Sequence, residues 1–548
     1  MFSSRRIRPF VLTCILVSLI IWYYHGFPDT HFGWYDNGSK LPPSSLSSTD
    51  EGHPLIQPPI LGPSLPSSPD EGHSGEGQTK APSTESSISI NPTGVPKGQT
   101  PGPVTSSDVL LIFKTGASTI WKRMPLHLTT TLSDARIPHS VIYSDLSERL
   151  ANSIESINVL ANVSNILKSY DADAYASYKD LPSPLHINTY REYGGLPGDE
   201  PQDVLLSNPP GWRLDKYKFI PMLTHAQRNW PNLKWYIYIE DDTFIFLDNL
   251  LLWLSTLSPD DEPSYYGGYS GGSNETFAQG GSGIVFSGSL MRTVFGGTNT
   301  PSLETYGNYT FNSCCGDVIL GKVLRDHGIS VNRGEYGSVS FRPEPPWKTG
   351  FEEWMWCSPV FTFHHLHQRD LSQLFQLERK HGESSRADVS NFYFFLIAYA
   401  NFKQRPILFR DIFTALIWKY LIPQRKQWDN FASRYVLTSN SLGGFPIDTV
   451  TNGLHKVMLA QASTSPNRCE NACKLLDDCL SWRHEVPAES NAEGVETCAL
   501  DMVVKLGREL DPLKKWEKGR EVVSGWMVDR IEERLMRDSC ETWKWNWG

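Results

Sequence analysis

Residues 235–243 read WYIYIEDDT: five apolar side chains, then three carboxylates and a threonine. A short continuous apolar run is typical of a strand that is buried on both faces of a sheet. The stretch therefore predicts a strand over Trp235–Ile239 that ends in Glu240, Asp241 and Asp242 at the edge of the sheet. Carboxylates this close repel one another, so the pattern favours a bound divalent cation, Mn²⁺ or Mg²⁺, with a solvated acidic turn as the alternative.

Strands and helices alternate on either side of this stretch. Four further segments carry such a pattern: VLLIFK at 109–114 and SVIYS at 140–144 as strands, and Tyr217–Asn229 and Leu247–Leu257 as helices. The alternation predicts an α/β domain with a mixed, mainly parallel sheet and flanking helices. Ligands of such sheets lie at the carboxyl ends of the strands, which makes Lys114 and Asp145 candidate ligand contacts beside residues 240–242.

A glycine-rich stretch between Gly267 and Gly297 leads into another predicted strand, Ile284–Ser287. Gly280, Gly281 and Gly283 stand directly before this strand. They either let the backbone approach a ligand closely or form a tight turn, and glycine content alone does not choose between the two.

The first 107 residues predict a membrane anchor followed by a stem. Residues 9–27 contain no Asp, Glu, Lys or Arg and follow three arginines at positions 5, 6 and 8. This pattern predicts a single-pass signal anchor over 9–27, a cytosolic tail over 1–8 and a lumenal remainder, with a cleaved signal peptide as the alternative. Residues 28–107 are rich in Ser, Pro, Gly and Thr and predict a disordered stem.

The net charge limits the class of binding partner, and the cysteines indicate the cellular compartment. A formal net charge of −10 without a long basic block argues against a nucleic-acid partner. Nine cysteines suit an oxidising lumen, and the four between residues 469 and 498 have no histidines at zinc-ligand spacing. They predict a small disulfide-stapled unit over 441–531, with a tail over 532–548. Four cysteines allow three pairings, and the sequence does not choose between them.

Six short motifs occur in one order: EDDT at 240–243, NL at 249–250, YGG at 266–268, GGSGIVFS at 280–287, CGDVILG at 315–321 and FTFHHL at 361–366. Together they resemble the fringe and core 1 β-1,3-galactosyltransferase family of inverting glycosyltransferases, in a fungal-type version. The likeness covers roughly residues 108–380. It implies a GT-A type nucleotide-sugar transferase domain over residues 108–430, a UDP-sugar donor, Mn²⁺ or Mg²⁺ as cofactor, and a Golgi or ER membrane location.

The resemblance also implies roles for the acidic triplet. Asp242 falls on the carboxylate that holds the metal, and Glu240 falls near the ribose, with Asp241 between them in the nucleotide site. Glu240 replaces the usual aspartate and adds one methylene. His364 falls on the second metal ligand, and an imidazole ligand suits Mn²⁺ better than Ca²⁺. His365 is the alternative ligand, and because side chains alternate along a strand we expect only one of the two histidines to face the metal.

Asp317, in the GDV segment, falls on the family's catalytic carboxylate and is the candidate base. From the residues alone it could equally cap the helix predicted over Val318–Leu324, and both roles can coexist. Three cysteines lie in the neighbouring segments: Cys314, Cys315 and Cys357. We expect them to tie the Asp317 region to the strand that carries His364.

Candidate nucleotide-binding residues lie near the ends of the first two strands and before the next helix. Lys114 and Asp145 would flank the nucleotide by position. Lys216, with Lys218 as the alternative, falls where the family has a lysine near the donor. A solvated helix start is the simpler account of either lysine.

The C-terminal unit resembles a PAN/Apple module, which is a small α+β fold. Its marks are Cys469, Cys473, CLSW at 479–482, TCAL at 497–500 and SGW at 524–526. The resemblance implies recognition of an acceptor or a protein partner, or a passive stabilising role.

The implied activity is transfer of galactose in β-1,3 linkage from a UDP-sugar to a glycan acceptor such as O-linked GalNAc on a glycoprotein. The donor sugar, the acceptor and the oligomeric state stay open. One rival is a catalytically inactive, membrane-tethered module that binds carbohydrate or protein. The other is a metal-dependent hydrolase, because paired acids and histidines also serve hydrolysis.

Overall fold

The computed structural model describes residues 103–540, apart from 134–135, 152, 182–209, 272–274, 333, 335, 338, 388–404, 446–452, 489–493 and 512–516. The cytosolic tail, the membrane anchor and nearly all of the stem predicted above lie outside the described residues. Within the described residues, no helix is both long and apolar enough to cross a bilayer.

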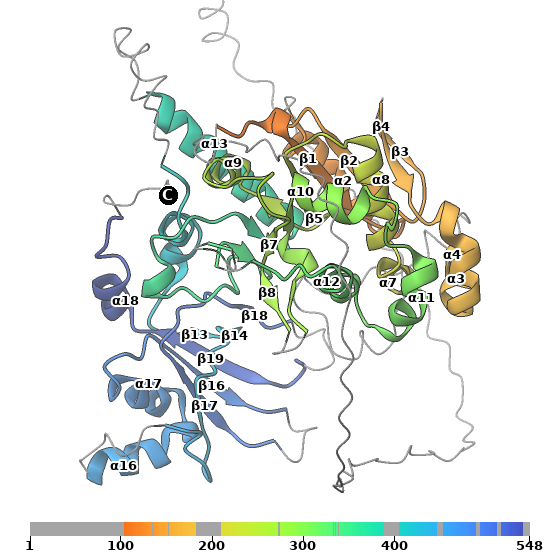
Figure 1. Ribbon diagram of the computed structural model, residues 1–548. Helices are drawn as coiled ribbons and strands as arrows, with labels where there is room; N and C mark the ends of the chain where they lie inside the picture. Colours follow the sequence, from red (N-terminus) through yellow and green to blue (C-terminus); the bar gives the residue numbers. More distant parts are fainter. Residues whose placement is uncertain are drawn as a thin grey trace, which may run out of the picture. The chain divides into compact units, whose positions relative to one another are not determined.

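The main sheet has seven strands in the described part of the chain, in the spatial order β3-β4-β2-β1-β5-β10-β7 (Figure 1). They span Val109–Lys114 (β1), Ser140–Ser144 (β2), Arg149–Ala151 (β3), Ile154–Asn158 (β4), Trp235–Glu240 (β5), Tyr265–Gly267 (β7) and Ile284–Ser287 (β10). The four central strands, β4, β2, β1 and β5, run parallel, whereas β3 and β10 run antiparallel to their neighbours. The predicted mixed, mainly parallel sheet is confirmed.

Two apolar cores lie on opposite faces of this sheet. Along β1, Leu110 and Ile112 point into one core, and Leu111 and Phe113 point into the other. All six residues of β1 are therefore buried, as expected for a strand covered on both faces. Helices α3 (Ser164–Tyr170), α4 (Ala172–Asp180), α8 (Phe219–Asn229), α11 (Leu303–Asn312) and α12 (Gly316–Asp326) contribute to the first core, and α2 (Ile120–Thr129) and α9 (Leu247–Leu254) to the second.

A second, three-stranded sheet positions the histidine segment. It consists of β11 (Phe341–Arg342), β12 (Thr362–Phe363) and β6 (Phe244–Ile245). Because β12 and β6 are antiparallel with Phe363 opposite Phe244, the residue after β12 lies beside the residues before β6. The backbone N–H of Leu366 donates to the carbonyl of Asp242 over 3.1 Å and fixes this approach. The register thus brings His364 to the acidic triplet.

The C-terminal unit is built on a five-stranded antiparallel sheet with helices beside it (Figure 1). The strands, in spatial order, are β13 (Arg425–Lys426), β19 (Glu521–Trp526), β16 (Ser481–Val486), β17 (Thr497–Asp501) and β15 (Tyr435–Leu437). The helices are α16 (Gly453–Ala460), α17 (Pro466–Lys474) and α18 (Val528–Arg534). The sheet includes residues that precede the predicted start of the unit at residue 441, because β13 and β15 have only two and three residues and are too short to show a strand pattern in the sequence.

Four disulfides join described cysteines. The pairs are Cys314–Cys315, Cys357–Cys540, Cys469–Cys498 and Cys473–Cys479. The last two are one of the three pairings that the sequence allowed. The expected link between the Asp317 region and the His364 strand is wrong, because Cys314 pairs with its own neighbour and Cys357 pairs with Cys540.

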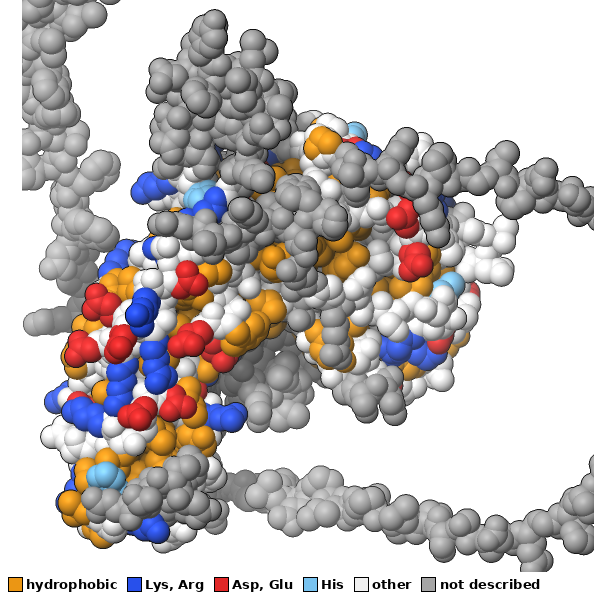
Figure 2. All heavy atoms as spheres, turned by 60° about the vertical axis from the view of Figure 1, so that its left-hand side comes forward, with side chains coloured by type: hydrophobic (Ala, Val, Ile, Leu, Met, Phe, Trp, Pro, Cys, Tyr) orange, Lys and Arg blue, Asp and Glu red, His pale blue; other side chains and the backbone are white. Residues whose placement is uncertain are grey.

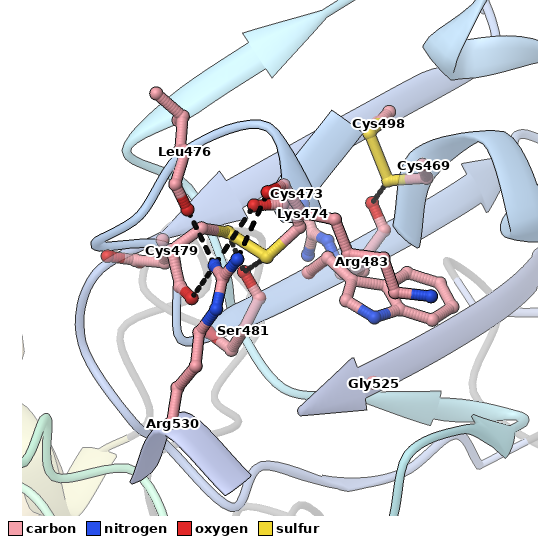
Figure 3. Close-up of a disulfide and its surroundings, with 12 residues drawn as sticks. Cys469, Cys473, Lys474, Leu476, Cys479, Ser481, Arg483, Cys498, Gly525 and Arg530 are labelled. Atoms are coloured by element: carbon pink, nitrogen blue, oxygen red, sulfur yellow. Dashed lines mark hydrogen bonds between the residues drawn. A yellow bond between two sulfur atoms is a disulfide. The ribbon is translucent and has the colours of Figure 1, made fainter. Parts of the chain in front are cut away.

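Arg530 on α18 closes the turn that follows α17 (Figure 3). Its guanidinium donates to the carbonyl oxygens of Cys473, Lys474, Leu476 and Cys479 over 2.6 to 3.3 Å. The last carbonyls of a helix have no partner within the helix, so a cation placed there satisfies several acceptors at once. Arg530 thereby ties α18 to the Cys473–Cys479 turn.

Acidic and basic side chains are intermixed on the face of the molecule that Figure 2 shows. Arg483 pairs with Asp429 over 2.8 Å, and Arg520 pairs with Glu485 over 2.8 Å and with Asp429 over 3.6 Å. The C-terminal sheet thus carries partly buried ion pairs of both signs rather than a patch of one sign.

An apolar core also joins the C-terminal sheet to the segment that precedes β12. Phe351 and Val504 are both fully buried in it and exchange backbone hydrogen bonds of 2.9 and 3.2 Å. Trp526 of β19 packs in the same core, together with α13 (Gln368–Ala387) and α15 (Phe409–Ile412). The histidine segment and the C-terminal unit therefore share one core.

Candidate metal and active site

The three carboxylates of the acidic triplet face three different partners at the end of β5. Glu240, the last residue of β5, lies 3.0 Å from the ammonium of Lys114. Asp241 turns toward the segment after β1 and accepts hydrogen bonds from Thr115 and Thr119 over 2.6 and 2.8 Å. Asp242 comes nearest to the histidine segment, with Oδ1 at 3.1 Å from His364 Nε2, and Glu240 Oε2 lies farther from it at 3.8 Å. Glu240 thus faces a lysine, Asp241 faces two hydroxyls, and Asp242 faces the candidate metal site.

Asp242, His364 and His365 form a group whose ligand atoms all lie within 4.8 Å of one another. His364 Nε2 lies 3.1 Å from Asp242 Oδ1, and His365 Nδ1 lies 3.9 Å from Asp242 Oδ2. The two imidazole rings stack, with their centroids 3.8 Å apart. The expectation that only one histidine could face this point is wrong. Strand β12 ends at Phe363, and His365 has a φ of 56°, so the alternation of a strand no longer applies.

The charge balance of this group favours a cation between Asp242 and His364. Burial opposes the ionisation of Asp242, but Arg123 and His364 outweigh it and hold the pKa of this carboxyl well below its usual range. Burial also lowers the pKa of His364, yet Asp242 and Glu240 raise it above its ordinary value. The two carboxylates therefore favour positive charge at this point, which a divalent ion could supply.

The donor atoms fit a first-row divalent metal. Asp242 Oδ1 is buried and accepts no well-directed hydrogen bond from the described residues. One carboxylate oxygen with imidazole nitrogens suits Mn²⁺, whereas Mg²⁺ and Ca²⁺ prefer oxygen ligands throughout. Asp242, His364 and His365 could hold such an ion and leave positions for oxygens of a ligand.

Gly281 makes room for the His364 ring. A Cβ at this position would lie 1.9 Å from His364 Cε1, so no other residue fits without moving the imidazole. The hydroxyl of Thr243 donates to the carbonyl of Gly281 over 2.7 Å and holds it in place. Gly283, two residues on, has a φ of 87° and turns the chain into β10. The tight turn thus holds at Gly283, whereas Gly281 makes room for a side chain of the site.

Asp317 lies in the first turn of α12, beside Glu240. The helix begins at Gly316 with Cys315 as its N-cap, so the prediction that Asp317 caps it is wrong. The Asp317 carboxylate accepts from the backbone N–H groups of Gly280 and Val318, each over 2.9 Å. Burial raises the pKa of Asp317 above its ordinary value, with a further contribution from Glu240, although these two N–H groups oppose the shift.

Gly280 separates the two carboxylates. A Cβ on it would lie 3.3 Å from Glu240 Oε1 and 3.4 Å from Asp317 Cβ. Asp317 and Glu240 therefore both lie next to Gly280. Glu240 Oε2 in turn lies 3.8 Å from His364 Nε2. The candidate base and the candidate metal ligands belong to one site.

Lys114 is held between two carboxylates at the end of β1. Its ammonium lies 2.5 Å from Asp215 Oδ2 and 3.0 Å from Glu240 Oε1, and 5.0 Å from the centroid of the Phe219 ring. Burial opposes the charge on Lys114, but both carboxylates raise its pKa well above the ordinary value. It remains a buried cation in the lining of the cavity, paired with both carboxylates.

The other predicted nucleotide contacts hold loops in place. Asp145 is fully buried, accepts from the backbone N–H of Ala117 over 2.8 Å and pairs with Lys218 over 2.9 Å. Lys216 donates to the carbonyls of Phe311 and Ser313 over 2.8 and 3.1 Å. Asp145 thus shapes the turn after β1, and Lys216 anchors the segment before Cys314.

A cavity of about 480 Å³ connects these groups, within the size range of small-molecule sites. It is lined by seven of the eight predicted site residues: Lys114, Lys216, Glu240, Asp241, Asp242, Asp317 and His364. Asp145, the eighth, is not among the lining residues. The sheet edge, the glycine-rich stretch, the start of α12 and the histidine segment therefore enclose one space.

Several lining residues were missed by the sequence reasoning. Arg123 of α2 reaches Asp241 over 2.9 Å and Asp242 over 3.2 Å. Thr119 and Arg123 are four residues apart on a helix that starts at a strand's carboxyl end, which was a usable signal. Trp212 of α7 (Pro210–Asp215) and Gln279 also line the cavity, and no spacing rule pointed to them.

Comparison with known proteins returned no family model that matches this chain and no curated protein that matches it.

Proposed function

We propose that this chain is a metal-dependent, inverting glycosyltransferase that transfers a sugar from a UDP-sugar to a hydroxyl of a glycan acceptor. The observation that carries the proposal is the shared cavity, which joins the group Asp242, His364 and His365 to the buried carboxylate Asp317. In the finer form suggested by the motifs, the domain is of the GT-A type and transfers galactose in β-1,3 linkage to an acceptor such as O-linked GalNAc.

Donor binding is supported by the balance of charge in the cavity. Its lining carries the carboxylates Asp215, Glu240, Asp241, Asp242 and Asp317 against the cations Lys114, Arg123, Lys216 and Lys218. A diphosphate would be repelled by such a lining unless a divalent ion joined it. Held by Asp242, His364 and His365, the ion would supply Lewis acidity toward the departing diphosphate. Lys114 and Arg123 border the same carboxylates and can orient the phosphate oxygens.

Asp317 is suited to the proton transfer. Its raised pKa makes it a stronger base than an exposed aspartate, and its two backbone donors keep the carboxylate oriented. In the proposed step the acceptor hydroxyl gives its proton to Asp317, and its oxygen bonds to the anomeric carbon. The bond from that carbon to the diphosphate oxygen breaks, and its electron pair leaves with UDP. Attack from the face opposite UDP inverts the anomeric centre.

The C-terminal unit and the disulfides support the location and a partner role. Cysteines paired in four disulfides suit an oxidising lumen such as that of the Golgi or the ER. A five-stranded sheet with α17 stapled to it by Cys469–Cys498 agrees with a PAN/Apple-like module. We propose a membrane-anchored lumenal enzyme in which this module contacts the acceptor glycoprotein.

UDP release from UDP-galactose by the purified full chain tests the proposal. The assay is run with and without Mn²⁺ and with and without methyl α-N-acetylgalactosaminide. A transferase releases UDP only with both present, and the new glycoside is recovered. A hydrolase releases UDP regardless of the acceptor, and an inactive binding module releases none, so either result refutes the proposal.

A further inference from the structure

The Cys314–Cys315 disulfide joins two neighbouring residues, so it does not stabilise the fold by linking distant parts of the chain. The other disulfides between described cysteines close separations of 183, 29 and 6 residues. A disulfide stabilises a fold mainly by restricting the unfolded chain, and the effect falls as the closed loop shortens. Between adjacent residues almost no loop is closed. The stabilising role that suits the other three therefore does not account for this one.

Its surroundings also set it apart. Cys469, Cys473, Cys479 and Cys498 are at most 1% exposed. Cys314, by contrast, is exposed and Cys315 is half-buried, and both line the cavity. This disulfide is thus the one, among those of the described residues, whose two cysteines line the cavity.

The disulfide is held rigidly beside the candidate base. Cys315 is the N-cap of α12, and Asp317 follows two residues later. A Cβ on Gly316 would lie 2.1 Å from the Phe219 ring, so this segment is packed directly on the floor of the cavity. On the other side, Lys216 binds the carbonyl of Ser313 over 3.1 Å. The residues on both sides of the disulfide, Ser313 and Gly316, are therefore held in place next to Asp317.

We propose that the Cys314–Cys315 disulfide is a contact surface for the acceptor, packing against the apolar C–H face of a pyranose ring whose hydroxyl lies at Asp317. The proposal rests on the function proposed above. A hydroxyl that gives its proton to Asp317 places its sugar ring close to the residues beside Asp317, which include the Cys314–Cys315 disulfide.

Sulfur is polarisable and a poor hydrogen-bond partner, so it suits the C–H face of a sugar rather than its hydroxyls. The bridged pair also has no rotamers to lose on binding, unlike two free side chains. The acceptor class that follows is a ring sugar rather than the hydroxyl of a free serine or threonine on a peptide.

The test compares three forms of the full chain. Cys314→Ser/Cys315→Ser removes the sulfurs and leaves a serine at the N-cap position, where serine is favoured, so α12 should still begin normally. Cys473→Ala/Cys479→Ala removes a disulfide away from the cavity and is the control for loss of a disulfide as such. Cys314→Ser alone opens the same ring and serves if the double variant folds poorly.

Two measurements are made with UDP-galactose and Mn²⁺. One is the KM for methyl α-N-acetylgalactosaminide, methyl β-galactoside, methyl α-mannoside and a threonine peptide. The other is glycoside binding in the presence of Mn²⁺ and UDP, by saturation-transfer NMR. We expect the Cys314/Cys315 serine variants to weaken the preferred glycoside about tenfold in both, and to leave the KM for UDP-galactose within twofold. The control variant should match the wild type in both.

Three results would overturn the proposal: unchanged glycoside affinity in the serine variants, a preference for the threonine peptide over every glycoside, or free-thiol labelling of Cys314 and Cys315 in the native protein. The two measurements distinguish a failure of the proposed function from a failure of the proposed contact surface. If no sugar is transferred but glycoside binding still falls tenfold, the contact surface stands and the proposed function falls. Efficient transfer with an unmoved acceptor KM refutes the contact surface alone.

Discussion

Replacing Gly281 by alanine tests the candidate metal site without touching a ligand. The new Cβ would lie 1.9 Å from His364 Cε1 and 2.3 and 2.4 Å from the two ring nitrogens. To restore an ordinary contact of 3.4 Å, the imidazole must retreat by about 1.5 Å, the difference between 3.4 and 1.9 Å. Its other face is closed by the His365 ring, stacked at 3.8 Å. A shift of this size displaces the ring relative to Asp242, whose Oδ1 lies 3.1 Å from His364 Nε2.

This displacement is large for metal binding. Metal–ligand distances tolerate shifts of roughly 0.2 Å, so an imidazole moved by about 1.5 Å no longer coordinates. Changes to residues that merely support a ligand reduce metal affinity about 10- to 100-fold. We therefore expect Gly281→Ala to weaken Mn²⁺ binding by about 100-fold or more, or about 2.7 kcal/mol.

Mn²⁺ affinity is measured by isothermal titration calorimetry with and without UDP, alongside thermal unfolding of each protein. Gly382→Ala is the matched control, because a Cβ on this α13 glycine meets nothing within 4 Å. The control should bind Mn²⁺ like the wild type. If Gly281→Ala keeps its Mn²⁺ affinity within threefold of the control while remaining folded, His364 is not a metal ligand.

Three further outcomes follow from described contacts. Asp317→Asn should lower kcat by about 10² to 10⁴ while the affinity for UDP and Mn²⁺ stays within a few-fold, and a normal kcat would exclude Asp317 as the base. Burial lowers the pKa of His127 to about 4 from 6.5, so the unfolded chain binds the extra proton first. Stability is then complete above pH 6.5 and falls by about 3 kcal/mol as the pH drops to about 4; urea titrations should show this loss flattened in His127→Gln. Arg530→Met removes the donor to four carbonyl oxygens and should lower the free energy of unfolding in urea by about 2 kcal/mol. An unchanged midpoint would mean that water replaces the guanidinium without loss.

The strands of the main sheet were predictable because burial on both faces makes them continuous apolar runs. VLLIFK and SVIYS become β1 and β2 with the predicted bounds, and the strand before the triplet extends by only one residue, Glu240. Strand direction was not predictable in the same way. Ile284–Ser287 has the predicted bounds but runs antiparallel to β5, and an apolar run carries no information on polarity.

The site residues that lie at strand ends were predictable. The positions that depend on local backbone turns were not. Lys114, Glu240 and Asp242 meet because adjacent parallel strands end together. His365 reaches the same point only because of a positive φ, which histidine adopts less readily than glycine and which no spacing rule forecasts. Asp145 follows a strand as expected, yet burial and Lys218 turn it away from the cavity.

The core shared by Phe351, Val504 and Trp526 has a practical consequence for protein production. A fragment cut at residue 430 would separate the two sides of this core, remove Cys540 from Cys357, and leave large aromatic side chains in water. Shortened expression fragments should therefore retain residues through Cys540. Destabilising mutations in the C-terminal strands should likewise lower the yield of folded protein, even where they lie far from the cavity.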